Sequence, residues 1–269
     1  MPKISLKGKN LPTSPIRKLS KYATDAKAKG IDVIHINIGQ PDIDTPAKAL
    51  QAIQSFDKNV LAYGPSEGSL AYRQKMCSYF AKHNIEVQPD DILVTTGASE
   101  AIIMTLDCIT NEGDELIIPE PFYANYDTFA AACGVKVVPV SSTIDSNFSL
   151  PPIDVIEGKI NAKTRAIFIC NPNNPTGHVY SKKELNDLAT LVKKHDLFLI
   201  VDEVYREFIY DGAVHHSVLT ISGLEEHAIL VDSMSKRYSM CGARIGCLVS
   251  KNKEVMDAAL KFAQSRLSP

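Results

Sequence analysis

The chain has 269 residues, of which 45% are hydrophobic, and its 29 basic and 31 acidic residues almost cancel. A chain of this size and composition can bury a sizeable core, as one large domain or as two modest ones. The formal net charge of -2 excludes a strong global positive field of the kind that attracts nucleic acid or an anionic membrane. A small-molecule partner is therefore expected.

The six cysteines are scattered along the chain and include no C-x-x-C pair. Several lie in apolar runs, where a free thiol packs as a small hydrophobe, so a reducing compartment is expected. The first 30 residues lack the apolar core of a signal peptide, and no later apolar run is long enough to span a bilayer. Their basic bias gives weak support to an organelle transit peptide, and a cytoplasmic location is the expectation.

Short apolar runs alternate with helical periods, which is typical of an α/β fold with a mostly parallel central sheet and helices on both faces. Residues 1–45, which several prolines interrupt, are predicted to form an N-terminal arm with a basic helix over 16–29 and a short strand over 33–38. Residues 46–269 are predicted to form a large domain. Its helices are expected at 46–56, 68–83, 99–109, 123–133, 182–195 and 253–267. Its strands are expected at 92–95, 115–118, 136–140, 166–170, 197–201, 229–231 and 245–249.

Polar residues follow three successive predicted strands at the point where each strand ends. Asn174 follows the first of these strands, Asp202 the second, and Ser233 and Lys236 the third. The carboxyl ends of parallel strands meet at one edge of a sheet, and open α/β sheets bind ligands at that edge. These side chains are therefore expected to lie close together.

Lys236 and Asp202 are the candidates for chemistry at this edge. A lysine amine adds to an aldehyde only when unprotonated, and a nearby cation such as Arg244 or Arg237 would lower its pKa from roughly 10.4 toward neutrality. Taken alone, Lys236 would be an ordinary surface charge. Asp202 follows five apolar residues, where an ionised carboxylate is costly unless it meets a cation such as a protonated pyridine nitrogen. A strand-end cap is the alternative.

Residues 96–100 (Thr-Gly-Ala-Ser-Glu) lie between a predicted strand and an apolar helix. The backbone N–H groups and the helix dipole at such a position can bind a phosphate dianion. An N-cap at Ser99 explains the same residues equally well. Arg244 adds a planar, permanently charged donor suited to phosphate; its alternatives are an ordinary surface arginine and a structural ion pair.

Three further polar or aromatic residues are candidates for ligand contacts. Asn174 lies in the Pro-rich turn at 171–177, where it can present its amide to a ligand oxygen, although turn composition alone favours a simple chain reversal. Tyr205 shares the face of Asp202 if a helical turn follows that strand. Tyr123 can stack on a flat heteroaromatic ring, although an aromatic residue here is more often part of the core.

Together these motifs resemble those of the fold-type I pyridoxal 5′-phosphate (PLP) enzymes, and specifically the class I/II aminotransferases related to aspartate aminotransferase. The resemblance runs from the N-terminal arm to the last residue. Its most specific parts are Asn-Pro-Asn-Asn-Pro-Thr-Gly at 171–177, Asp-Glu-Val-Tyr at 202–205, and the block from Ser-x-Ser-Lys to Gly-x-Arg-x-Gly at 233–246. It implies the large-domain fold of these enzymes.

The resemblance implies a role for each motif residue. Lys236 would carry the internal aldimine and shuttle a proton between the substrate and the cofactor. Asp202 would pair with the pyridine nitrogen, and Tyr123 would stack on the ring. The other implied contacts are Asn174 and Tyr205 to the phenolic oxygen, Gly39 and Asn174 to the substrate, and Ala98, Ser99, Ser233, Arg244 and Tyr63 to the phosphate. Tyr63 would come from a second subunit, which implies a homodimer. No metal is expected.

The resemblance also implies a segment beyond the end of this chain. Family members normally continue into a small C-terminal domain, which supplies the arginine that binds the substrate carboxylate. This chain ends at Pro269, and no residue can be assigned that role. A truncated form or fragment is therefore expected, in which residues 1–45 include a segment of the small domain. Such a form would bind the cofactor with weak or absent transamination, because a poorly oriented substrate reacts slowly.

The expected function is amino-group transfer between an L-amino acid and a 2-oxo acid, with aspartate and 2-oxoglutarate as the first pair to test. One alternative is a PLP-dependent lyase on the same scaffold, which would release pyruvate and ammonia. Another is a non-catalytic fragment that binds PLP, a sensed ligand or a partner, because aminotransferase-like domains also occur in transcription regulators. Neither nucleic acid nor a membrane is an expected partner.

Overall fold

A seven-stranded sheet forms the centre of the computed structural model, which describes residues 2–15, 17–57 and 59–266. Its strand order is β1-β7-β6-β5-β4-β2-β3. The strands are β1 Ile92–Thr95, β2 Glu115–Glu120, β3 Lys136–Ser141, β4 Thr164–Cys170, β5 Phe198–Asp202, β6 Ala228–Ser233 and β7 Gly246–Val249. Strands β2 to β6 run parallel, whereas β7 is antiparallel to both of its neighbours, β1 and β6. The predicted, mostly parallel sheet is confirmed.

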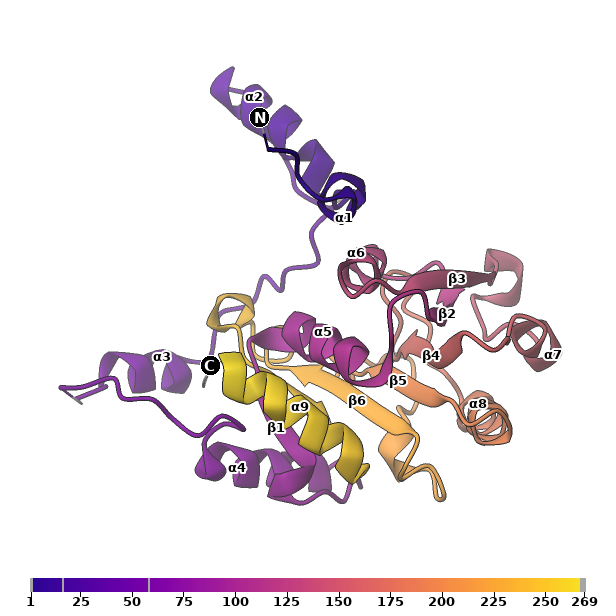
Figure 1. The fold of residues 1–269 in the computed structure, drawn as a ribbon. Helices are drawn as coiled ribbons and strands as arrows, with labels where there is room; N and C mark the ends of the chain where they lie inside the picture. The colour runs from indigo at the N-terminus through magenta and orange to yellow at the C-terminus, as the bar shows by residue number, and fades with distance from the viewer. Residues whose placement is uncertain (1, 16, 58, 267–269) are drawn as a thin grey trace.

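Helices cover both faces of this sheet (Figure 1). The α-helices are α1 Leu6–Asn10, α2 Ser20–Ala28, α3 Ala47–Gln54, α4 Leu70–Ala81, α5 Gly97–Ile109, α6 Asn125–Ala132, α7 Ile153–Glu157, α8 Lys182–Lys194 and α9 Lys253–Arg266. Short 3₁₀ turns lie at Arg17–Leu19, Pro89–Asp91, Ile144–Ser146, Val218–Thr220 and Cys241–Ala243. No described helix is both long enough and apolar enough to cross a membrane.

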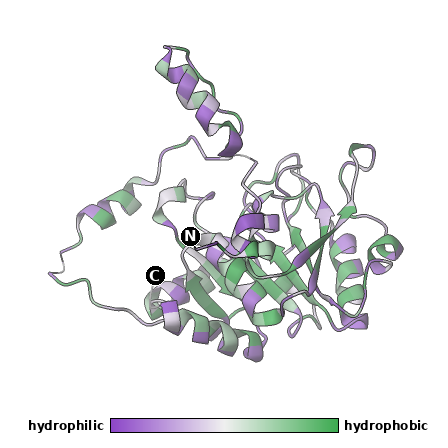
Figure 2. Cartoon of the chain, turned by 45° about the horizontal axis from the view of Figure 1, so that its top comes forward, coloured by the Kyte–Doolittle hydropathy of each residue, from purple (hydrophilic) through white to green (hydrophobic). Residues whose placement is uncertain are grey.

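The central strands are apolar on both faces. Along β4, Ala166, Phe168 and Cys170 belong to a core shared with α5, α6 and α9, whereas Ile167 and Ile169 belong to a core shared with α4, α7 and α8. Figure 2 shows these strands as an apolar centre between helices with polar outer sides. Because almost every residue of β4, β5 and β6 is buried on one face or the other, these strand sequences are nearly continuously apolar instead of alternating.

Helix α8 shows how the sequence specifies an element that covers the sheet. Ser181 caps its start, because the Ser181 hydroxyl accepts the N–H of Glu184 and the Glu184 carboxylate accepts the N–H of Ser181. Leu185, Leu188 and Val192 follow at the spacing of one helical face, and all three are fully buried. The helix is therefore specified by its cap and by one apolar stripe.

The predicted strand at 33–38 is wrong, whereas the strands predicted in the large domain are all present with small shifts at their ends. Residues 33–38 include alternating isoleucines, but no described strand pairs with them, and Ile34 and Ile36 are 82% and 93% exposed. The predicted helix at 16–29 is present as a 3₁₀ turn followed by α2; residues 16 and 267, at the ends of two predicted helices, lie outside the described residues. The five-residue helices α1 and α7 were not predicted.

The N-terminal segment lies largely outside the core. None of the described residues before Gly68 is buried, and α1 and α2 stand away from the sheet (Figure 1). Tyr22, Leu61 and Tyr63 are among its exposed large hydrophobic side chains. The six cysteines, by contrast, lie within the sheet domain and are all free thiols.

We expect Leu188→Ala to lower the free energy of unfolding by about 2–5 kcal/mol, because it removes a fully buried side chain between α8 and the sheet. Lys193→Ala, on the exposed side of the same helix, is the control and should change stability by less than about 0.5 kcal/mol. Urea denaturation of both variants measures the difference. Equal effects of the two substitutions would contradict the packing described for α8.

Candidate functional site

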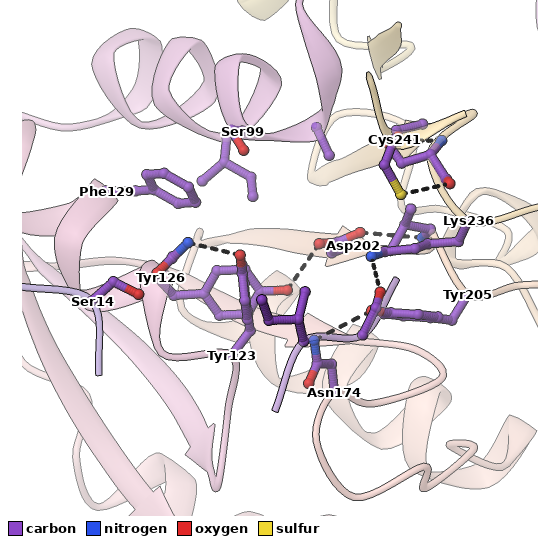
Figure 3. A pocket seen from close by; sticks show the side chains of 18 of the residues that line it. Ser14, Ser99, Tyr123, Tyr126, Phe129, Asn174, Asp202, Tyr205, Lys236 and Cys241 are labelled. Atoms are coloured by element: carbon purple, nitrogen blue, oxygen red, sulfur yellow. Dashed lines mark hydrogen bonds between the residues drawn. The ribbon is translucent and has the colours of Figure 1, made fainter. Parts of the chain in front are cut away.

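A cavity of about 310 Å³ lies at the sheet edge where β4, β5 and β6 end (Figure 3). Its volume is in the range of small-molecule sites. Every residue predicted for the site lines this cavity except Tyr63: the lining includes Gly39, Ala98, Ser99, Tyr123, Asn174, Asp202, Tyr205, Ser233, Lys236 and Arg244. Tyr63 is 84% exposed and does not line the cavity, so its predicted action from a second subunit stays a prediction.

The direction of β7 explains how Arg244 reaches this edge. Arg244 lies two residues before β7, and the amino end of an antiparallel strand lies beside the carboxyl ends of its neighbours. Accordingly, Gly246 pairs with both Thr95 and Ser233. The antiparallel strand thus brings an arginine that precedes it to the same edge as residues that follow β1 and β6.

Two glycines let Arg244 approach the first turn of α5. An added Cβ at Gly97 would lie 2.4 Å from Nη2 of Arg244, and one at Gly246 would lie 2.7 Å from the backbone N of Ala98. The guanidinium donates to the Thr96 carbonyl at 3.4 Å and forms no ion pair with a described acidic residue. A permanent cation beside unpaired N–H groups of a helix N-terminus forms a cradle for an anion.

Ser99 lies inside the first turn of α5 and lines the cavity, so the alternative in which it is the N-cap is wrong. The N-cap position belongs to Thr96, whose side chain makes no capping bond. On the neighbouring strand, the Ser233 hydroxyl accepts the N–H of Ser235 at 3.0 Å. Ser99 and Ser233 therefore line the same cavity as Arg244.

Asp202 ends β5 and is 5% exposed. Its Oδ2 accepts the hydroxyl of Tyr126 at 2.9 Å, and its Oδ1 accepts the N–H of Val204 at 3.2 Å. Burial raises the pKa of the Asp202 carboxyl to about 6, although the Tyr126 hydrogen bond acts to lower it. The Val204 contact is the turn-capping bond of the alternative interpretation, but it engages only one carboxylate oxygen.

Tyr126 is a site residue that the sequence interpretation missed. It lies on α6, three residues after Tyr123, which precedes that helix, and its N–H donates to the Tyr123 carbonyl at 2.9 Å. The centroids of the two rings are 5.4 Å apart in an edge-to-face arrangement. The Tyr123 hydroxyl accepts the side-chain amide of Asn125 at 2.7 Å, and the Asn174 amide donates to the Tyr205 hydroxyl at 3.4 Å. Figure 3 shows Tyr123, Tyr126, Asn174 and Tyr205 around Asp202 and Lys236.

Lys236 lies on the loop after β6. Its Nζ donates to the Gly39 carbonyl at 2.5 Å and lies 5.8 Å from the centroid of the Tyr205 ring. Arg237 was a candidate cation for the Lys236 amine, and this expectation is wrong. Its side chain is 2% exposed, points into the core and pairs with Asp232.

Other lining residues gave no usable signal in the sequence. Ser14, Arg17, Asn37 and Ile38 come from the arm, in which only Gly39, the residue after Ile38, was predicted for the site. Phe129, Ser235 and Cys241 also line the cavity. No group of three or more His, Cys, Asp or Glu side chains suited to a metal ion is present among the described residues.

Comparison with known proteins places this geometry in a family. The family described as aminotransferase class I and II matches residues 31–269. The chain is 33% identical to an aspartate aminotransferase of Bacillus sp. (strain YM-2), over 97% of this chain and 67% of that protein. It is 36% identical to aromatic-amino-acid aminotransferase 2 of Thermococcus litoralis, over 88% of this chain and 60% of that protein.

Solved structures of aminotransferases also resemble this chain. The aspartate aminotransferase of Thermotoga maritima superposes with a TM-score of 0.91 at 30% identity, over 97% of this chain and 70% of that one. The alanine aminotransferase of Pyrococcus furiosus gives a TM-score of 0.90 at 31% identity, over 99% and 70% of the two chains. The chain thus spans about two thirds of the length of its relatives. It belongs to the aminotransferase class I and II family.

Proposed function

We propose that this chain holds PLP in the cavity and that Lys236 serves amino-group transfer between an L-amino acid and a 2-oxo acid. The observation that carries the proposal is the environment of Asp202. A buried carboxylate is stable as an anion only when a cation or several hydrogen bonds accompany it. Asp202 lacks the cation, and a protonated pyridine nitrogen would supply one.

The other buried carboxylates of the described residues show the contrast. Each of them pairs with a cationic side chain: Asp114 with Arg165 at 2.9 Å, Glu115 with Lys136 at 3.2 Å, Glu203 with Arg206 at 2.9 Å, and Asp232 with Arg206 at 3.3 Å and Arg237 at 2.5 Å. Asp202 forms no ion pair among the described residues. Its charge is therefore available to a ligand in the cavity.

The residues around Asp202 fit the rest of the same cofactor. The Arg244 cradle suits a phosphate dianion, and the Tyr123 ring lies on the wall beside the carboxylate. Asn174 and Tyr205 present an amide and a hydroxyl that can hold a ring oxygen. When bound, PLP would supply an electron-poor ring that accepts an electron pair from the substrate.

Lys236 has two tasks in this proposal. Its amine would hold the aldehyde of the cofactor, and it would also move a proton at the substrate α-carbon. The contact with the Gly39 carbonyl holds the amine at the cavity wall, on the side proposed for the substrate. The named relatives act on different amino acids, so the proposal extends to the amino-acid class, with aspartate as the first candidate.

We also propose that the working unit is a homodimer in which Tyr63 of one copy reaches the phosphate in the other. Tyr63 lies outside its own cavity, in a segment where Val60 and Leu61 are 71% and 85% exposed. Such apolar side chains favour contact with a second protein surface. Sedimentation equilibrium tests the association, and a strictly monomeric chain that binds PLP fully would contradict the proposed role of Tyr63.

We expect the PLP-loaded chain to pass the amino group of L-aspartate to the cofactor, leaving pyridoxamine 5′-phosphate and oxaloacetate. Single-turnover conditions detect even slow transfer, and Lys236→Ala, which lacks the proton-transferring amine, should slow it by at least about 100-fold. Chromatography of the cofactor and keto acid measures both products. Release of ammonia, with PLP unchanged, would instead indicate a lyase.

We expect Arg244→Gln to weaken PLP binding by roughly 10- to 100-fold, which is the loss of a charge-assisted contact with phosphate. Pyridoxal, which lacks the phosphate, is the matched ligand and should bind the variant and the parent chain alike. Fluorescence titration gives both dissociation constants. An equal loss for the two ligands would mean that Arg244 stabilises the cavity without contacting phosphate.

We expect Asp202→Asn to stabilise the cofactor-free chain at neutral pH. Because the folded pKa of Asp202 is raised from 3.8 to about 6, its contribution to stability is fully present below about pH 4 and is lost as the pH rises through 6. The stability gap between variant and parent should therefore grow by about 1 kcal/mol from pH 5 to pH 8. Urea denaturation measures it, with the exposed Asp145→Asn as control; a pH-independent gap would contradict the raised pKa.

A further inference from the structure

A buried charged cluster lies directly behind the cavity. It consists of the side chains of Tyr79, Glu203, Arg206, Asp232 and Arg237, and it joins α4 to the ends of β5 and β6. The four charged side chains are at most 2% exposed. A buried charge that loses its partner destabilises the fold, so such a cluster favours an arrangement in which every partner stays in place.

Asp232 and Tyr79 are the two points at which the arginines converge. The Asp232 carboxylate accepts Arg237 at 2.5 Å and Arg206 at 3.3 Å, and Arg206 also donates to Glu203. The Tyr79 hydroxyl accepts a bond from each arginine, at 3.2 Å from Arg206 and 2.5 Å from Arg237. The Arg237 guanidinium lies 4.3 Å from the centroid of the Tyr79 ring, so it is held by an ion pair, a hydrogen bond and a cation–π contact together.

The Tyr79 hydroxyl uses all of its hydrogen-bonding capacity. Besides accepting from the two arginines, it donates to Glu207 at 2.7 Å. One hydroxyl has one proton and two acceptor sites, so no position is left for water or for a rearranged partner. The three hydrogen bonds therefore fix the positions of Arg206, Arg237 and Glu207 around the Tyr79 hydroxyl.

Each charged member of the cluster is the chain neighbour of a residue that lines the cavity. The pairs are Glu203 with Asp202, Arg206 with Tyr205, Asp232 with Ser233, and Arg237 with Lys236. In the last pair, Lys236 extends into the cavity while Arg237 extends into the core. Holding the arginine therefore restrains the backbone from which the lysine amine extends.

We propose that Tyr79 and Arg237 are positioning residues that set the placement of the Lys236 amine. This inference rests on the proposed function, because it concerns the lysine that would bind the cofactor aldehyde. Within the described residues, the only hydrogen bond of the Lys236 side chain is to Gly39, in an exposed segment of the arm. The buried anchor next to it is thus the firmer restraint on its position, and displacement of a reacting group by about 1 Å can cost up to 100-fold in rate.

The test compares two ligands that differ in their use of Lys236. PLP bonds covalently to the lysine amine, whereas pyridoxamine 5′-phosphate carries no aldehyde and binds through phosphate and ring alone. Tyr79→Phe removes the shared acceptor and keeps the ring. Arg237→Lys keeps the charge beside Asp232 but loses the planar fork that reaches two partners at once. Both variants should weaken PLP binding about tenfold more than they weaken binding of pyridoxamine 5′-phosphate.

Arg165→Lys is the matched control, because Arg165 pairs with the buried carboxylate of Asp114 and does not line the cavity. It should lower thermal stability without separating the two ligands. Equal losses for both ligands in Tyr79→Phe and Arg237→Lys, or no loss at all, would overturn the positioning role. Failure of the parent chain to bond PLP at Lys236 would instead contradict the proposed function, so the two failures are distinguishable.

Discussion

The buried charge of Asp202 is the constraint on which the rest of the site depends. Burying a carboxylate without a cation raises its pKa to about 6 and lowers stability at neutral pH. The neighbouring arginines do not relieve it, because Arg206 and Arg237 are engaged by Glu203 and Asp232. A fold that keeps an uncompensated anion in its core, beside a cavity, is poised for a ligand that carries the missing positive charge.

The sheet arranges the other contacts around that charge. Parallel β4, β5 and β6 bring Asn174, Asp202 and Lys236 to one edge, and the reversed β7 brings Arg244 to the same edge from the opposite direction. The charged cluster behind the cavity then connects these strand ends to α4. Four residues that line the cavity (Asp202, Tyr205, Ser233 and Lys236) are each adjacent in the chain to a buried, ion-paired residue that is fixed in the core.

The sequence predicts those elements and site residues that a local sequence pattern marks, and it misses those that depend on distant parts of the chain. Continuous apolar runs predicted the strands of the large domain, and the polar residues that follow them predicted where Asp202 and Lys236 meet. The alternating run at 33–38 has the pattern of a strand, but a strand also needs a pairing partner, and periodicity in the sequence does not reveal one. Arg237 was assigned to the wrong side of its loop because the sequence does not show which way a side chain turns. The path of the arm brings Ser14 and Arg17 to the cavity, and no local sequence motif indicates that path.

The most direct test of the account is borohydride reduction of the chain with PLP, followed by peptide mapping. We expect one pyridoxyl label, on the peptide that contains Lys236, and its loss in Lys236→Arg. That variant keeps a cation at the cavity wall but offers no amine that bonds an aldehyde at neutral pH. A label spread over exposed lysines, or one that persists in the variant, would contradict the assignment of Lys236 and the reading of Asp202 as the partner of a bound pyridine ring.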